Sequence, residues 1–142
     1  PSPRQFSVRA PLARLVHTAD VAAQLQDPAA QTLIDARATP RFRGETEPLD
    51  PVAGHIPGAL NRPYGHNLTD SGKFKSAAVL RQEFEQLLGT RSAASVVHHC
   101  GSGVSAVPNI LAMEIAGLGR TGLYAGSWSE WCTTPGLPCD KG

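Results

Sequence analysis

The chain has 142 residues, of which 41% are hydrophobic and 18% are charged, and its formal net charge at pH 7 is +1. This length and apolar content suit one globular domain with its own core, so we expect residues 1–142 to form a single domain. The near-neutral charge argues against a nucleic-acid or anionic-membrane surface, and no apolar run approaches the length of a membrane span.

The first third of the chain predicts a strand, a helix and a second strand. Residues 14–16 are compatible with a short strand. Thr18 then stands as the N-cap of a helix that has Asp20 in its first turn and that ends before Pro28. Residues 32–36 (TLIDA) are short and apolar apart from one carboxylate near their end, which predicts a buried strand.

The rest of the chain continues this alternation. Residues 39–58 are polar and rich in Pro and Gly, and so long a loop in a small domain is usually functional. Residues 59–63 form a weak strand candidate that Pro63 stops. Residues 76–88 carry apolar side chains at helical spacing, and Gly89 fits the C-terminal cap of that helix. The elements that follow are a strand, a helix, a strand and a helical turn, at residues 95–99, 104–118, 122–124 and 127–131.

The order of these elements predicts the fold class. Strands alternate with helices and no hairpin signal occurs, which is typical of an α/β fold with a mostly parallel central sheet and helices on both faces. Ligands of such sheets gather at the carboxyl ends of the strands. Cys100 follows one predicted strand, and Arg37 and Arg41 follow another, so this edge of the sheet is the expected place for a site.

Cys100 begins a glycine-rich turn, CGSGVS, between a strand and a helix. Gly101 and Gly103 let the backbone turn tightly and adopt positive φ, so that successive N–H groups can point inward as an anion-binding nest. The N-terminus of the following helix points to the same place. A thiolate at Cys100 would be stabilised there, so the turn predicts a nucleophile beside a cradle for an anion. An inert buried cysteine would not need two glycines.

Two other interpretations of this turn fail on the residue pattern. His99 and Cys100 match the opening of a His-Cys-x5-Arg phosphatase loop, but the sixth residue after Cys100 is Ala106 and the next arginine is Arg120. A metal site is also disfavoured, because neighbours on a strand such as His98 and His99 point to opposite faces. We therefore expect no metal and no cofactor, and we expect the histidines to pack or to form hydrogen bonds beneath the loop.

The N-terminal sequence and the number of cysteines indicate how the protein is processed and which compartment it occupies. The N-terminal sequence PSPRQFS is not a signal peptide, and it lacks an initiator Met, which fits a processed or excised piece of a longer protein. Three cysteines, Cys100, Cys132 and Cys139, are too few and odd in number for a disulfide framework. We therefore expect a reducing, cytoplasmic location. Cys132 and Cys139 flank a short loop, and we interpret them as ordinary thiols.

Four segments, in this order, resemble the rhodanese family of sulfurtransferases. They are LIDARATPRFRG at residues 33–44, GHIPGALNRP at 54–63, CGSGVSA at 100–106 and LYAGSWSEW at 123–131. The chain looks most like the catalytic C-terminal domain of tandem-domain 3-mercaptopyruvate or thiosulfate sulfurtransferases. The resemblance implies a rhodanese-like fold and an N-terminal rhodanese-like domain as a partner, with neither nucleic acid nor membrane among the partners.

The resemblance also implies a chemistry. Cys100 would take a sulfur atom from 3-mercaptopyruvate or thiosulfate, hold it as a persulfide and pass it to a thiol or to cyanide. Arg41 would bind the substrate anion, and Ser102 would hydrogen-bond or relay a proton. The uncharged loop favours 3-mercaptopyruvate, because the thiosulfate-preferring loop of the family looks like CRKGVT, with two cations. The active-site loop implied around Cys100 consists of Gly101, Gly103, Val104 and Ser105.

The alternative is a non-catalytic rhodanese-like binding or regulatory module, although such modules often lose the cysteine that this chain keeps. Several features depart from the family pattern. Ser105 replaces the usual Thr, Ala125 stands where an Asp often occurs, and the second anion-binding Arg of mercaptopyruvate enzymes is absent near Leu49. Pro108 would remove a hydrogen bond from a helix that begins at Val104. Further residues of the matching segments are interpreted as structural supports: Asp35, Arg37, His55, Asn61, Trp128 and Trp131.

Overall fold

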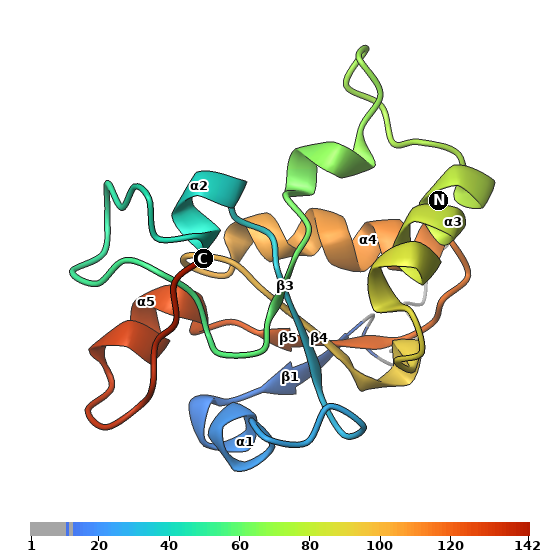
Figure 1. Cartoon of the computed structure of the whole chain (residues 1–142). Helices are drawn as coiled ribbons and strands as arrows, with labels where there is room; N and C mark the ends of the chain where they lie inside the picture. Colours follow the sequence, from blue (N-terminus) through green and yellow to red (C-terminus); the bar gives the residue numbers. More distant parts are fainter. Residues whose placement is uncertain (1–10, 12) are drawn as a thin grey trace, which may run out of the picture.

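The computed structural model describes residue 11 and residues 13–142, and Figure 1 shows how their helices and strands are arranged. One sheet has the strand order β1-β5-β4-β2-β3, and its strand pairs are all parallel. The predicted α/β fold with a mostly parallel sheet is therefore confirmed. The N-terminal sequence PSPRQFS, in which we found no signal peptide, lies outside the described residues. The strands are β1 (Ala13–Val16), β2 (Thr32–Asp35), β3 (Leu60–Asn61), β4 (Val96–His99) and β5 (Thr121–Tyr124).

Helices cover both faces of the sheet, as the sequence predicted (Figure 1). On one face lie α1 (Thr18–Ala23) and α5 (Ser127–Thr133), and on the other lie α3 (Ala77–Leu88) and α4 (Val107–Ile115). A short helix, α2 (Thr39–Phe42), follows β2. The 3-10 helices among the described residues are η1 (Tyr64–Asn67), η2 (Ala93–Ser95) and η3 (Val104–Ala106).

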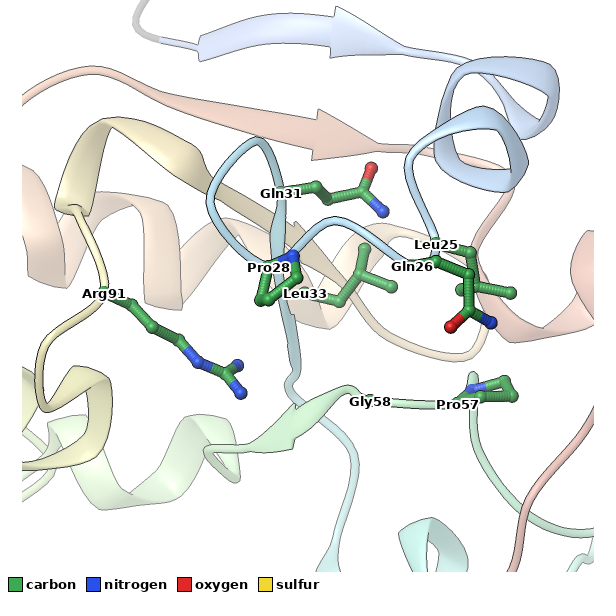
Figure 2. A pocket seen from close by; sticks show the side chains of 8 residues that line it. All are labelled: Leu25, Gln26, Pro28, Gln31, Leu33, Pro57, Gly58 and Arg91. Carbon is green, nitrogen blue, oxygen red and sulfur yellow. The ribbon is translucent and has the colours of Figure 1, made fainter.

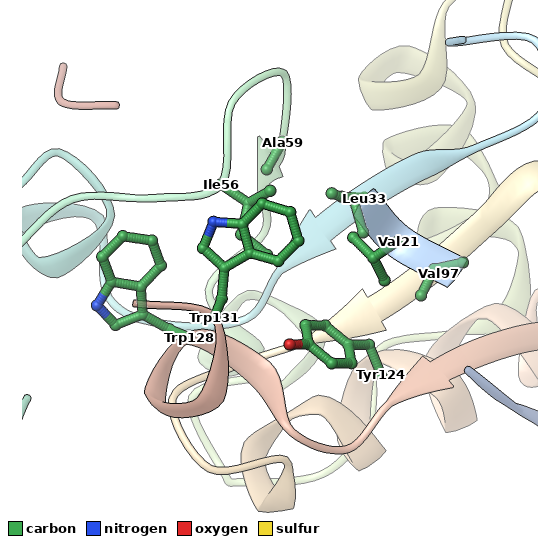
Figure 3. Close-up of a cluster of buried hydrophobic side chains, with 8 residues drawn as sticks. All are labelled: Val21, Leu33, Ile56, Ala59, Val97, Tyr124, Trp128 and Trp131. Atoms are coloured by element: carbon green, nitrogen blue, oxygen red, sulfur yellow. The ribbon is translucent and has the colours of Figure 1, made fainter. Parts of the chain in front are cut away.

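Alternation along the strands divides the core into two layers, because neighbouring side chains on a strand point to opposite faces. On β2, Leu33 packs in the layer of α1 and α5, whereas Ile34 packs in the layer of α3 and α4. Figure 3 shows the first layer, in which the aromatic side chains of β5 and α5 lie among aliphatic side chains from the strands, from α1 and from the loop before β3. The buried members of that layer are Val21, Leu33, Ile56, Ala59, Val97, Tyr124, Trp128 and Trp131.

The long helix α3 forms where the sequence predicted it. The side chain of Ser76 caps its N-terminus by accepting a hydrogen bond from the N–H of Val79 at 3.3 Å. Leu80, Phe84 and Leu88 recur every four residues and are buried against the sheet. Gly89, at φ +59°, ends the helix in a conformation that favours glycine.

The predicted N-cap of α1 is wrong. The cap is His17, whose N–H donates to the Asp20 carboxylate at 3.0 Å, and Thr18 is the first helical residue. The hydroxyl of Thr18 instead lies 2.7 Å from the phenol oxygen of Tyr124, so a tertiary contact takes the side chain that could have capped the helix. The helix also ends earlier than predicted, at Ala23.

The region after Cys100 also differs from the prediction. Instead of one helix over residues 104–118, η3 is followed by α4, which ends at Ile115. Pro108 therefore lies in the first turn of α4, where a missing N–H removes no intrahelical hydrogen bond. Because α4 begins at Val107 and not at Val104, the loss of a hydrogen bond expected at Pro108 does not occur. Within residues 39–58, the helix α2 was not predicted.

No helix in the part of the chain that the structure describes combines the length and the apolar character needed to cross a bilayer.

Candidate active site

The register of the sheet brings the ends of β2 and β4 together. Asp35 pairs with His99, and the N–H of Ala36 donates to the His99 carbonyl at 2.8 Å. Cys100 follows directly and is buried, with 2% of its surface exposed, against Ala36 and Ala106. The thiol therefore lies at the carboxyl edge of the sheet, where a ligand of a parallel α/β sheet is expected.

The loop after Cys100 folds back over the sulfur. The N–H of Gly103 donates a hydrogen bond to the Cys100 Sγ at 2.9 Å. Gly103 has φ +97°, and a Cβ there would lie 2.5 Å from the carbonyl oxygen of Ala125. Both the backbone conformation and the space therefore require glycine.

Gly101 differs from the prediction, because it is not among the residues with positive φ. A Cβ at Gly101 would instead lie 3.3 Å and 3.4 Å from the two terminal nitrogens of the Arg41 guanidinium. The Arg41 guanidinium thus lies close to the backbone at Gly101, and of the two glycines only Gly103 adopts a positive φ.

The start of α5 holds the Cys100 peptide in place. The hydroxyl of Ser127 accepts from the N–H of Cys100 at 3.0 Å and donates to the carbonyl of Tyr124 at 2.9 Å. The N–H groups of Trp128 and Ser129 donate to the carbonyls of Cys100 and Gly101 at 3.0 and 2.9 Å. Because the Cys100 N–H donates to the Ser127 hydroxyl, this N–H is not part of the predicted anion-binding nest around the sulfur.

Ser127 adopts φ +57°, which is uncommon for a residue with a side chain and which the hydrogen bonds of its hydroxyl stabilise. Sequence reasoning missed its role. The only signal was its position in the LYAGSWSEW segment that resembles the family.

A cavity of about 310 Å³ opens over Cys100. It brings together the predicted residues Cys100, Gly101, Ser102, Ser105 and Arg41, whereas Gly103 and Val104 do not line it. Val104 points away, with 75% of its surface exposed. Lining residues that sequence reasoning missed are Ala38, Leu49, Asp50, Tyr64 and Ser129.

Arg41 is the predicted substrate-binding cation of this cavity, but its guanidinium is already paired. One terminal nitrogen lies 3.0 Å from a carboxylate oxygen of Glu47 and 3.3 Å from one of Asp50. Its Nε is buried and has no hydrogen-bond partner among the described residues. Burial raises the pKa of Glu47, but the N–H groups of Asp50 and Leu49, together with Arg41, outweigh this and lower it overall. Glu47 therefore remains a carboxylate.

The fold and the cavity agree with what comparison with known proteins finds. The model of the rhodanese-like domain family matches residues 17–134. The chain belongs to this family. It is 46% identical to a probable 3-mercaptopyruvate sulfurtransferase of Pseudomonas aeruginosa over 140 residues, which are 99% of this chain and 49% of that protein. A putative thiosulfate sulfurtransferase of Mycobacterium tuberculosis is 44% identical over 111 residues, 78% of this chain and 38% of that protein.

Among solved structures, the Tum1 protein of Saccharomyces cerevisiae matches with a TM-score of 0.75 and 28% identity, covering 89% of this chain and 46% of that one. The rhodanese-like domain described by our structure thus spans about half the length, or less, of the proteins it matches.

Arg37, also at the cavity wall, is a structural residue of the rhodanese-like domain, as predicted. Its guanidinium forms a buried ion pair with Asp35 at 2.7 Å and donates to the carbonyl of Gly54 at 2.7 Å. It also lies over the ring of Trp128, 5.0 Å from the centroid. These contacts tie the end of β2 to the loop before β3 and to α5.

Two further predicted supports act on the same loops. The ring of His55 bonds to the carbonyl of Phe42 at 2.8 Å and stacks on the Phe42 ring at 4.0 Å. The amide of Asn61 donates to the carbonyls of Asp35 and Arg37 at 3.1 and 2.9 Å. Both residues hold loops that shape the cavity. Trp128 and Trp131 are fully buried packing residues and do not line it.

His98 and His99 lie on opposite faces of β4, as strand alternation predicted. His98 is buried with its Nε2 3.2 Å from the sulfur of Met113 in α4. His99 faces the other layer, with its ring centroid 6.3 Å from that of Tyr124. Burial, with the charge of His99 as the smaller cause, lowers the pKa of His98 to about 3. Burial is also the main reason that the pKa of His99 is lowered. Both are neutral packing residues.

The remaining thiols do not line the cavity over Cys100, and a second hollow lies away from it. Cys132 and Cys139 are both free thiols. A hollow of about 240 Å³ lies beside Gln31, which precedes β2, and therefore at the opposite end of the sheet from Cys100. Figure 2 shows its lining, in which Arg91 is the charged side chain. It contains no nucleophile, so we place the candidate active site at Cys100.

Proposed function

We propose that this rhodanese-like domain is a sulfurtransferase that moves a sulfane sulfur from 3-mercaptopyruvate or thiosulfate to a thiol or to cyanide. The observation that carries the proposal is the Cys100 thiol at the base of a cavity, with one N–H donor on the sulfur and a guanidinium in the same cavity. The names of the relatives support the same chemistry.

The reaction has two steps. The Cys100 thiolate attacks the sulfur of 3-mercaptopyruvate, an S–S bond forms, and the C–S bond breaks with its electron pair left on carbon as the enolate of pyruvate. The proton of the donor thiol moves to that carbon, which gives pyruvate and a Cys100 persulfide anion. Thiosulfate gives the same persulfide and releases sulfite, with no proton transfer. Cyanide or a thiolate then attacks the outer sulfur, and the Cys100 thiolate is restored.

Three groups have proposed roles in these steps. The N–H of Gly103, already 2.9 Å from the Cys100 Sγ, stabilises negative charge on the sulfur. Arg41 holds the carboxylate or sulfonate end of the donor. Ser102 relays the proton to the enolate carbon, so a Ser102→Ala change should slow turnover of 3-mercaptopyruvate by roughly tenfold or more. Loading from thiosulfate, which needs no such proton, should slow much less, and equal slowing with both donors would contradict this role.

Intact-mass measurement after incubation with each donor tests the proposed function. We expect a gain of one sulfur atom that treatment with cyanide removes as thiocyanate. The gain should be lost in Cys100→Ser and kept in Cys132→Ser, a matched control at a thiol that does not line the cavity. The proposal is wrong if neither donor adds sulfur to the wild-type chain.

We also propose that 3-mercaptopyruvate is the preferred donor, because residues 101–105 carry no charged side chain.

We further propose that this domain is the catalytic half of a two-domain protein in a reducing compartment, the cytoplasm. The chain covers 49% of its P. aeruginosa relative, and its three cysteines are free. Two apolar side chains of the loops around the site lack cover: Leu49, which lines the cavity, is 79% exposed, and Val104, which follows Cys100 in the same loop but lies outside the cavity lining, is 75% exposed. A covering domain would bury them. Turnover by this chain alone should therefore be weak, and turnover equal to that of a two-domain relative would argue against the proposal.

A further inference from the structure

The charges behind the Cys100 cavity are unusual for a site that binds anions. Arg37 and Arg41 supply two positive groups, while Asp35, Glu47 and Asp50 supply three negative groups. These five side chains are joined by ion pairs of 2.7 to 3.5 Å, and they are largely buried, so bulk water screens them poorly. The cluster thus has one negative charge in excess before any donor binds.

Among the three carboxylates, only Asp50 lines the cavity. Asp35 is paired with Arg37 beneath the wall, and Glu47 is held by the N–H groups of Leu49 and Asp50 and by Arg41. One oxygen of Asp50 lies 3.3 Å from the Arg41 guanidinium, and the other accepts from the hydroxyl of Ser129 at 2.7 Å. The Asp50 carboxylate therefore shares with any donor the guanidinium that would bind it.

We propose that Asp50 determines the charge of the sulfur donor, by making the cavity accept a monoanionic thiol acid more readily than a dianion such as thiosulfate. This inference rests on the proposed function and adds a specificity-determining residue to it. Each unit of negative charge on a donor interacts unfavourably with the Asp50 carboxylate. The unfavourable interaction therefore counts twice for a dianion and once for a monoanion. As a result, the Asp50 carboxylate changes the ratio of the activities with the two donors and does not lower both equally.

The sharpest change is Asp50→Asn, which keeps the size of the side chain and its hydrogen bond with Ser129 while removing the charge. We expect the ratio of kcat/KM for thiosulfate to kcat/KM for 3-mercaptopyruvate to rise roughly tenfold, which corresponds to about 1.4 kcal/mol.

Three further variants separate charge from structure. Asp50→Glu keeps the charge and should keep the wild-type ratio. Tyr64→Lys adds a positive charge at a partly exposed position of the cavity wall, removes no hydrogen bond of the Asp50 side chain, and should shift the ratio toward thiosulfate even if Asp50→Asn folds poorly. Glu85→Gln removes the same charge from an exposed ion pair on α3 and should leave the ratio unchanged.

A second measurement needs no turnover. Iodoacetate is a monoanion and iodoacetamide is neutral, and both alkylate a cysteine thiolate with release of iodide. The ratio of their rates at Cys100 reports the potential at the sulfur, and Asp50→Asn should raise the iodoacetate to iodoacetamide ratio by a similar factor. If Cys100 takes up sulfur but neither ratio moves, Asp50 does not set donor charge and the proposed function stands. If Cys100 takes up no sulfur, the proposed function fails. The alkylation ratio alone then shows whether the Asp50 carboxylate disfavours negatively charged reagents at Cys100.

Discussion

Gly103 and Cys100 are joined by a hydrogen bond from the glycine N–H to the cysteine sulfur, 2.9 Å long, that only a glycine at this position allows. The bond depends on φ +97° at Gly103 and on the close approach of the Ala125 carbonyl. The conformation of the loop and the electrostatics of the thiol are therefore set by the same residue.

Gly103→Ala should abolish this arrangement. The added Cβ would lie 2.5 Å from the Ala125 oxygen, so the loop must move and the N–H must leave the sulfur. We expect sulfur loading to slow by at least roughly tenfold and the free energy of unfolding to fall by about 1–3 kcal/mol. Gly119→Ala is the control, because Gly119 has φ +82° but no neighbour within 4 Å of the new Cβ. It should lose stability but keep its loading rate. Loading at the wild-type rate in Gly103→Ala would show that the hydrogen bond is dispensable.

Ser127→Ala should weaken both the fold and the loop. It leaves the buried N–H of Cys100 and the carbonyl of Tyr124 without their partner, which costs about 1–3 kcal/mol of unfolding free energy. We expect slower sulfur loading as well, because the Cys100 peptide loses one of its anchors to α5. Denaturant unfolding and mass-detected loading measure the two effects. Ser127→Thr, which keeps a hydroxyl, should restore part of the loading rate, and equal loss in both variants would point to strain at φ +57° instead.

The sequence predicted the positions of Cys100 and Arg41 because both follow strands, and the ends of parallel strands meet at one edge. It could not predict that Asp50 and Ser129 reach the same cavity. The path of Asp50 depends on Glu47, whose carboxylate accepts the N–H groups of Leu49 and Asp50 at 3.1 Å each. The position of Ser129 depends on the left-handed conformation of Ser127. Neither of these local arrangements leaves a periodic signal in the sequence.

The error at the start of α1 has a related cause. Thr18 is a good N-cap by residue type, but its hydroxyl is bonded to Tyr124, a partner 106 residues away in the chain. The Tyr124 contact removes Thr18 as a cap, and the local bond from the His17 N–H to the Asp20 carboxylate places the cap one residue earlier. By contrast, Gly89 ends α3 as predicted, and Ser76, which we expected to be the first residue of that helix, is its N-cap, because the cap interactions described there are local.

Glu47→Gln should change both the stability and its dependence on acid pH. In the folded chain the pKa of Glu47 is lowered from its ordinary value of 4.5, so its contribution is fully present above pH 4.5 and is lost as the pH falls through the lower folded value. The variant should be less stable at pH 7, by about 1–3 kcal/mol, because Arg41 and Arg37 lose a charged partner. It should also lose less stability than wild type below pH 4.5. Denaturant unfolding at several pH values, with the exposed Glu85→Gln as control, checks both, and parallel curves would contradict the role.

His98 gives a pH dependence of the same sign as Glu47 but for a different reason, since it is buried without charge. Its pKa is about 3 in the folded chain and 6.5 ordinarily, so the unfolded chain binds more protons between these values and stability falls as the pH falls through this window. At pH 5 the loss from this residue is about 2 kcal/mol relative to neutral pH. His98→Leu should remove that part of the slope between pH 7 and pH 5 in denaturant unfolding. The same substitution at the exposed His66 should leave the slope as it is in wild type. An unchanged slope in His98→Leu would mean that the imidazole against Met113 is already protonated at pH 5, with a charge buried in the layer of α3 and α4.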